Sequence, residues 1–180
     1  MKLSEFFHNL ATTDLADSHF ANSKEGKIVQ RHIPAMITHT RYALDTLYTR
    51  FPLHEKEVAI RMIAGMSHYK LHSDYAEFNT GSEAYPKYIV DSPFEPFKDD
   101  ILRIERVYDE VGNELPFNDD AICCAVKTVA YDTIQVINAV ESDVLFAIYR
   151  ASHEYIPSDA NPDEVHLAVP QSHMEALSYY

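Results

Sequence analysis

Ten of the 180 residues are histidines, the side chains that most often bind metals and transfer protons near neutral pH. His68 and His72 are four residues apart, a spacing at which two histidines of a helix can share one metal ion. Their segment has the pattern of a strand, in which four residues span roughly 13 Å, too far for one ion. The histidines near the expected helices form no HExxH motif: His8, His19, His32 and His39. The sequence therefore predicts no metal site and no cofactor.

Paired carboxylates form the second group of residues that could do chemistry, because two acids can act together as acid and base. Asp99 and Asp100 precede an expected strand, and Asp119 and Asp120 follow one. Both pairs are typical of the solvated ends of strands, and no pattern brings them, or Glu154, next to another acid. We expect no catalytic carboxylate.

Two adjacent cysteines, Cys123 and Cys124, are the third candidate, as a nucleophile. Neighbouring residues rarely form an unstrained disulfide with each other, so no disulfide framework is implied and a reducing compartment suits the chain. Segment 122–126 is apolar and predicts a buried strand, in which a cysteine acts as a small hydrophobic residue. GxSxG, Walker and GxGxxG motifs are absent from the sequence. The sequence predicts that this protein is not an enzyme.

The chain is acidic, with 15 basic and 28 acidic residues and a net charge of −13. Such a charge disfavours binding to DNA or to an anionic membrane through the general field of the protein. The charge is explained by solubility, or by a surface that must repel a polyanion. No apolar run approaches the roughly 20 residues of a membrane span, so we expect a soluble protein without a membrane partner.

Residues 33–53 predict a long helix, because apolar residues recur along them at helical spacing. Pro34 suits the first turn, and Pro52 ends the helix and makes Phe51 extended. The stripe consists of Ile33, Met36, Ile37, Thr40, Ala43, Leu44, Leu47, Tyr48 and Phe51. A shorter helix should begin after Ser4 as its N-cap and end near residue 15, followed by a polar loop over 17–27.

After Pro52 the pattern changes to short alternating runs, which predict strands. We expect one hairpin from 58–63 and 68–71, although 55–63 could also be helical, and a second from 101–108 and 114–117 around a turn at 109–113. Further strands are predicted at 122–128, 133–137 and 144–151, and an extended piece at 165–169. Residues 72–96 form a long aromatic loop, typical of segments that are functional or are ordered by a partner. Pro170 opens a last short helix.

These elements predict an α+β fold, in which N- and C-terminal helices form a helical bundle and an antiparallel β-rich domain is inserted between them. The bundle comprises 1–55 plus 165–180, and the inserted domain comprises 56–164 with the irregular loop at 72–96.

Eight phrases, in order, resemble head-to-tail adaptor (connector) proteins of tailed bacteriophages. They are KIV at 27–29, YALDTLYTRFPL at 42–53, GMSHYKL at 65–71, FKDDILRIERVYDE at 97–110, ELPFND at 114–119, VLFAIYRASH at 144–153, LAVP at 167–170 and EAL at 175–177. None is a catalytic signature, and the likeness lies in their order over residues 25–180.

The resemblance implies a non-enzymatic virion protein of the neck, between capsid and tail, that forms a ring, usually of twelve copies, under the portal. Its implied partners are the portal protein, neighbouring copies in the ring, and tail or nozzle proteins. DNA would pass through the lumen without specific binding, and the chain would occupy the host cytoplasm during assembly. A longer C-terminal helix that docks on the portal is also implied.

Two groups of residues are candidates for the interfaces of such a ring. The helix face opposite the apolar stripe, together with the end of that helix, carries Thr38, Arg41, Asp45 and Arg50. The aromatic loop carries Tyr75, Phe78, Tyr85 and Tyr88, which neighbouring copies would bury.

Three other functions remain open. The chain could form another neck or tail ring, such as a nozzle or a tail terminator, although a terminator normally has a more continuous α/β pattern. It could be a soluble host-directed binding module that works as a monomer. A small enzyme that uses a carboxylate or a cysteine is the last alternative.

Overall fold

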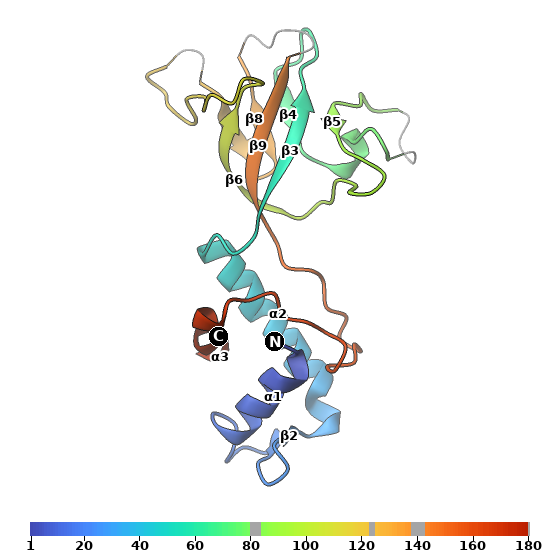
Figure 1. Ribbon diagram of the computed structural model, residues 1–180, viewed down its shortest axis with the longest axis vertical. Helices are drawn as coiled ribbons and strands as arrows, with labels where there is room; N and C mark the ends of the chain where they lie inside the picture. Colours follow the sequence, from blue (N-terminus) through green and yellow to red (C-terminus); the bar gives the residue numbers. More distant parts are fainter. Residues whose placement is uncertain (80–83, 123–124, 138–142, 180) are drawn as a thin grey trace. The chain divides into compact units, whose positions relative to one another are not determined.

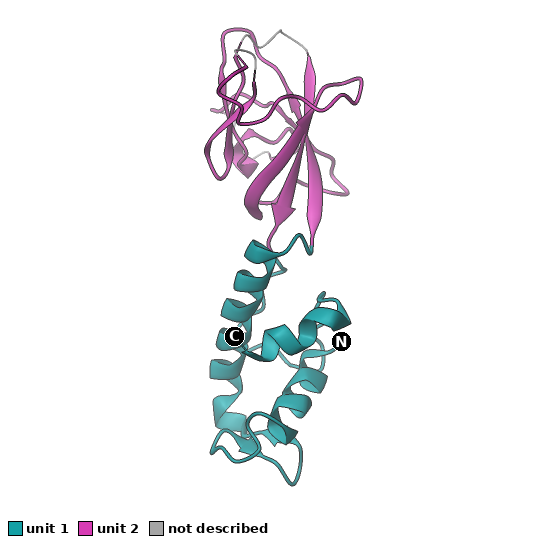
Figure 2. Cartoon of the chain, turned by 90° about the vertical axis from the view of Figure 1, so that its left-hand side faces the viewer, with its two compact units in different colours: residues 1–53, 153–180 teal, residues 54–152 magenta. Residues whose placement is uncertain are grey.

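A computed structural model describes residues 1–180 except 80–83, 123–124, 138–142 and 180. The chain divides into two compact units (Figure 2). Unit 1 is formed by Met1–Leu53 together with His153–Tyr180, and unit 2 by His54–Ser152. Residues 153–164, which the sequence analysis placed in the inserted domain, are therefore part of unit 1.

The long helix of unit 1 is confirmed as α2 (Ile33–Arg50), with Pro34 in its first turn. Phe51 follows with the extended angles φ −118° and ψ 142°, as expected for a residue before proline. Six of the nine residues of the predicted stripe are buried, namely Ile37, Thr40, Ala43, Leu44, Leu47 and Tyr48. Ile33 and Met36 are only half-buried, and Phe51, which follows the helix, is exposed. The short helix η1 (Gln30–His32) precedes α2.

The first helix, α1 (Leu3–Thr12), differs from the prediction at both ends. The prediction of Ser4 as N-cap is wrong, because Leu3 is already helical and the cap residue is Lys2, whose N–H donates to Glu5 Oε2 at 2.9 Å. The predicted loop at 17–27 contains the small hairpin β1 (Ala21–Asn22) and β2 (Lys27–Ile28).

The described residues of unit 2 form two antiparallel sheets (Figure 1). The four-stranded sheet has the order β5 (Ile89–Val90), β3 (Glu55–Arg61), β9 (Val144–Ala151), β6 (Ile101–Tyr108). The three-stranded sheet has the order β4 (His68–Lys70), β8 (Thr133–Gln135), β7 (Lys127–Ala130). Both sheets contribute side chains to one hydrophobic core. Strand β9 alternates strictly between buried and half-buried residues, which is the pattern of a strand with one face on the core.

The strand prediction for the start of unit 2 is confirmed, but its hairpin is wrong. Strand β3 pairs with β5 and β9, whereas β4 pairs with β8 in the other sheet. Gly65, at φ +77°, allows the turn between β3 and β4. The buried Tyr69 hydroxyl accepts the Ile63 N–H at 2.9 Å and lies 3.1 Å from the Met66 carbonyl. The chain therefore crosses between sheets at this turn.

The second predicted hairpin is confirmed only in part. The Asp109 carboxylate accepts N–H groups of Val111 and Asn113, and Gly112 has φ +90°, so the turn forms as predicted. After it, Glu114 makes an isolated bridge to Tyr108, and no strand is assigned over 114–117. Pro116 has no N–H to donate to β6, and the chain changes partner there: the Pro116 carbonyl accepts the Val126 N–H at 2.9 Å, and Phe117 bridges Val126.

The remaining predictions in unit 2 have mixed outcomes. The strand at 144–151 is confirmed with the expected bounds, and the strand at 133–137 is shorter, as β8. The strand predicted at 122–128 contains Cys123 and Cys124, which lie outside the described residues, and β7 begins only at Lys127. The long loop contains the one-turn helix η2 (Ser73–Tyr75) and the short strand β5.

The predicted fold class is wrong. The structure is mixed α/β and mainly β, with three α-helices and three antiparallel sheets in the described residues. The terminal helices form no bundle, because α3 (Met174–Tyr179), preceded by η3 (Gln171–His173), has only 6 residues. Such a helix is too short to supply a bundle with the several turns of interdigitating side chains that it needs. The extended piece expected at 165–169 is reduced to a bridge between His166 and Lys2.

Candidate functional site

The acidic pair at the start of β6 connects segments of unit 2 that are distant in the sequence. Asp99 accepts hydrogen bonds from the N–H and the hydroxyl of Ser73, both at 2.7 Å. Asp100 accepts hydrogen bonds from Lys56 Nζ at 2.6 Å and from the Tyr149 hydroxyl at 3.2 Å. Each carboxylate therefore accepts hydrogen bonds from other segments of unit 2.

The other predicted acids also have local roles. Asp120 lies 2.6 Å from Lys127 Nζ, and the hydrogen bond and positive charge of that ammonium lower the pKa of the Asp120 carboxyl. Asp119 accepts the N–H of Ala121 at 2.9 Å. Glu154 is exposed. These observations agree with the interpretation of the acids as solvated groups at strand ends and loops.

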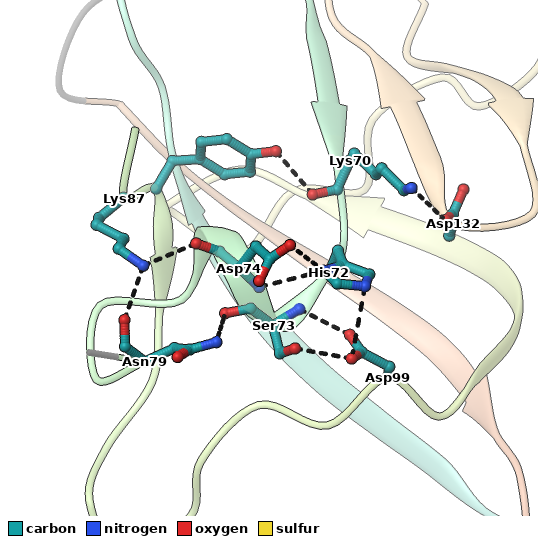
Figure 3. Close-up of polar contacts among 9 residues, drawn as sticks. Lys70, His72, Ser73, Asp74, Asn79, Lys87, Asp99 and Asp132 are labelled. Atoms are coloured by element: carbon teal, nitrogen blue, oxygen red, sulfur yellow. Dashed lines mark hydrogen bonds and ion pairs between the residues drawn. The ribbon is translucent and has the colours of Figure 1, made fainter. Parts of the chain in front are cut away.

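The most connected polar cluster joins the two ends of the aromatic loop (Figure 3). Lys87 Nζ donates to the carbonyls of Asp74 and Asn79 at 2.7 and 2.8 Å, and Asn79 Nδ2 donates to the Ser73 carbonyl at 2.8 Å. The Ser73 contacts to Asp99 connect the loop to the segment before β6. Most of these acceptors are main-chain carbonyls, so the cluster fixes the path of the backbone.

This cluster contains a serine, a histidine and an aspartate, the residue types of a catalytic triad. In a triad the serine hydroxyl donates to the imidazole that removes its proton. Here the Ser73 hydroxyl donates to Asp99, and His72 Nδ1 accepts the Asp74 N–H at 3.2 Å. The cluster is therefore arranged to order the loop and not to activate a nucleophile.

Metal and membrane sites were searched for within the described part of the chain. No group of three or more His, Cys, Asp or Glu side chains there is close enough to hold a metal ion. None of the helices described combines the length and the apolar character that a membrane span requires.

Two of the four predicted interface residues on α2, Arg41 and Asp45, contact the returning segment of unit 1. The guanidinium carbon of Arg41 lies 4.4 Å from the centroid of the Tyr155 ring. Asp45 Oδ1 lies 3.1 Å from His153 Nε2, and His153 Nδ1 lies 2.7 Å from the Glu154 carbonyl. Arg41 and Asp45 thus hold residues 153–155 against α2.

The other two predicted residues of α2 have contacts of different kinds. The Thr38 hydroxyl donates to the Pro34 carbonyl at 2.9 Å within the helix. Arg50 is exposed in the last turn of α2, where a cation interacts favourably with the helix dipole.

The four aromatic candidates of the loop fall into two groups. Tyr88 is fully buried and Tyr75 is packed against the core, with their rings stacked at 4.9 Å, so both belong to the interior of unit 2. Burial raises the pKa of the Tyr88 phenol, whose hydroxyl donates to the Lys70 carbonyl at 2.7 Å. Phe78 and Tyr85 are 50% and 47% exposed, and these two remain available to a partner.

Sequence reasoning missed the contribution of residues 153–157 to unit 1. These residues have neither helical nor alternating periodicity, so no pattern predicted that they pack against α2. Tyr155, Phe94 and Tyr42 are also highly exposed aromatic side chains that were not proposed as interface residues. Their exposure is decided by the tertiary structure, and the aromatic residue type was the only signal in the sequence.

A scan against protein-family models finds no family that matches this chain, and a search of curated proteins finds no matching sequence.

Proposed function

We propose that this chain is a structural protein of the tailed-phage virion, a head-to-tail adaptor that assembles as a ring between the portal and the tail. The observation that carries this proposal is the interrupted organisation of the chain. A compact, β-rich unit, 54–152, is inserted between the two parts of unit 1, 1–53 and 153–180. An inserted β-rich domain is what the resemblance to head-to-tail adaptors implies.

The resembling phrases coincide with structural elements, which supports the proposal. The phrase at 42–53 covers the second half of α2, the phrase at 97–110 covers β6, and the phrase at 144–153 covers β9. Strands β6 and β9 pair with each other in the four-stranded sheet. The likeness is therefore located in the framework of both units.

Exposed aromatic side chains support the proposal that this chain assembles with other protein subunits. Tyr42 is 62% exposed, Tyr131 66%, Tyr155 67% and Phe94 99%. Burying exposed apolar groups of this size against a neighbouring protein is favourable, because it removes apolar surface from water. In a ring, each copy would present one face to a different face of the next copy.

The net charge of −13 suits a subunit that surrounds DNA without retaining it. Negative charge on a channel wall repels the phosphate backbone, so the DNA can slide through. A protein that holds DNA would need the opposite balance of charge.

The test is the mass of the purified protein, alone and mixed with the portal ring of the same genome, by native mass spectrometry. The expected result is capture of about a dozen copies per portal ring, close to the usual ring size of adaptors. A monomer that ignores the portal overturns the proposal and favours the host-directed binding module.

A matched pair of variants locates the contact. Tyr42→Ser changes an exposed residue of α2, and Tyr131→Ser changes an equally exposed residue between β7 and β8. If the outer face of α2 meets the portal or a neighbouring copy, Tyr42→Ser should weaken capture at least tenfold, which is about 1.4 kcal/mol. Tyr131→Ser should then capture like the wild type, and equal effects of the two variants would remove α2 from the interface.

A further inference from the structure

On one side, strand β3 is paired at only two of its seven residues. Towards β9, β3 pairs at every residue from Glu55 to Arg61. Towards β5, it pairs only at Ala59 and Ile60. Residues 55–58 therefore form an open edge within the sheet, beside the short strand β5 (Figure 1).

The main-chain groups at this open edge can be assigned from the alternation of the strand. The Arg61 N–H donates to the Tyr88 carbonyl on the β5 side, and the Met62 N–H donates to the Asp143 carbonyl on the β9 side. The N–H and C=O groups of successive residues point to alternate sides of an antiparallel strand. The main-chain N–H and C=O groups of Glu55 and Glu57 therefore point towards the open side, as the N–H of Arg61 does. Within the described residues, no main-chain hydrogen bond reaches them there.

Strand β5 ends because the chain turns away directly after it. The N–H of Glu95 donates to the Ser92 carbonyl at 3.2 Å, which closes a turn that contains Pro93. The Asp91 carboxylate fixes the base of this turn by accepting the N–H groups of Phe78 and Phe97 at 3.0 and 3.1 Å. The turn leaves a groove of about 630 Å³ between β3 and residues 91–98. This volume lies within the roughly 300–1,000 Å³ typical of binding sites.

The groove is acidic. Four carboxylates (Glu55, Glu57, Asp91 and Glu95) and two lysines (Lys56 and Lys98) line it, which leaves a net negative charge. Glu57 and Glu95 are exposed, and Glu57 has no ion-pair partner among the described residues, whereas Glu55 lies 3.8 Å from Arg106. The charge of Lys56 is neutralised by Asp100 at 2.6 Å. Burial, reinforced by the negative charges of Asp100 and Glu95, raises the pKa of the Tyr149 phenol at the inner side of the groove. The open edge therefore favours a cationic occupant.

The two faces of the sheet differ in what they offer to an added strand. Glu55 and Glu57 point to the outer face, so residues paired with them would place their side chains next to two carboxylates. The intervening residue would point to the inner face, where Phe97 and the buried Tyr149 lie with ring centroids 6.3 Å apart. The complementary sequence therefore alternates basic, apolar, basic.

We propose that the open edge of β3, residues 55–58, binds an extended segment of a partner protein in which basic and apolar residues alternate. The segment adds to the sheet as a strand and exchanges main-chain hydrogen bonds with Glu55 and Glu57. One basic side chain pairs with the unpaired carboxylate of Glu57, a second shares the Glu55 carboxylate with Arg106, and the apolar side chain covers Phe97. This inference depends on unit 2 alone and not on the adaptor proposal.

The test uses acetyl-Lys-Val-Lys-Val-Lys-amide as the probe and the full chain labelled for amide NMR. We expect binding that weakens as salt is raised, together with slower hydrogen exchange of the Glu55 and Glu57 amides. A peptide with Glu in place of every Lys should bind at least tenfold more weakly. The same loss is expected when the central lysine amide of the probe is N-methylated, because that change removes a main-chain donor.

A charge-reversed variant and its control distinguish the contribution of the groove carboxylates to probe binding from that of the net charge of the protein. Glu57→Lys combined with Glu95→Lys should weaken probe binding at least tenfold. Glu114→Lys lies beyond β6 at the opposite edge of the sheet and should leave the affinity within twofold of the wild type. Binding without protection of the Glu55 and Glu57 amides, or equal binding of the Lys and Glu peptides, would overturn the proposal.

Discussion

Replacing Asp100 with Asn should destabilise unit 2 by about 1–3 kcal/mol, because it leaves the Lys56 ammonium without its counter-charge in a partly buried site. The two charged groups are 2.6 Å apart, and their side chains are only 27% and 17% exposed. Removing one partner of a fully buried pair costs about 3–5 kcal/mol, and an exposed pair contributes about 0.2–1 kcal/mol. This pair lies between these limits.

Asparagine removes both the charge and the acceptor of the Lys56 hydrogen bond, because its NH2 group takes the place of the oxygen that Lys56 contacts. The amide oxygen of Asn can still accept the Tyr149 hydroxyl, now 3.2 Å from the Asp100 carboxylate, so that hydrogen bond need not be lost. For a unit of about 100 residues, each kcal/mol changes Tm by about 4–8 °C, so a loss of about 1–3 kcal/mol should lower Tm by about 4–24 °C.

The assay is urea denaturation followed by tyrosine fluorescence, which suits a chain with 12 Tyr and no Trp. A double-mutant cycle with Lys56→Met should give a coupling energy of at least about 1 kcal/mol, because Met removes the charge that Asn leaves unpaired. A stability of Asp100→Asn within about 0.5 kcal/mol of the wild type, the range of ordinary surface changes, would refute this reasoning.

Three further predictions follow from single groups. Tyr69→Phe removes the acceptor of a buried N–H and should cost about 1–3 kcal/mol in chemical denaturation, whereas an unchanged midpoint would show that water replaces the hydroxyl. Burial raises the folded-state pKa of Tyr88 and Tyr149 above the unfolded value of about 10. Their stabilising contribution is therefore complete below pH 10 and is lost as the pH rises towards the folded-state pKa. An absorbance titration should show some tyrosines that ionise only well above pH 10. Uniform ionisation of all tyrosines near pH 10 would contradict this prediction. Arg41→Ala should cost about 0.5–1 kcal/mol of unfolding free energy by removing the contact with Tyr155, and a loss of portal capture without any loss of stability would instead return Arg41 to the interface.

The sequence alone predicted the elements whose periodicity extends over several turns or residues. The α2 stripe from Ile37 to Tyr48 was sufficient to locate a long helix, because one face of a helix must be apolar to be buried. The alternation over 144–151 located β9 with the correct bounds, because one face of that strand lies on the core. Local chemistry also predicted the turn at Asp109, whose carboxylate binds the nearby N–H groups.

The candidate site was less predictable because it depends on contacts between distant residues. Sequence spacing placed Arg41 and Asp45 opposite the buried stripe, but only the tertiary structure brings Tyr155 and His153 to them. Tyr88 has the same residue type as the exposed Tyr85, and its burial follows from the packing of β5.

The sequence by itself determined the long helix α2, the strands β3, β6 and β9 and the turn after β6, because these elements depend on interactions among residues close in the chain. Only the tertiary structure decided that β3 and β4 enter different sheets, that the terminal helices form no bundle, and that β3 keeps an open edge. Strand pairing satisfies main-chain groups with any compatible partner, so many pairings agree with the same local pattern. The shared core of unit 2 selects one of them by burying the apolar faces of both sheets together.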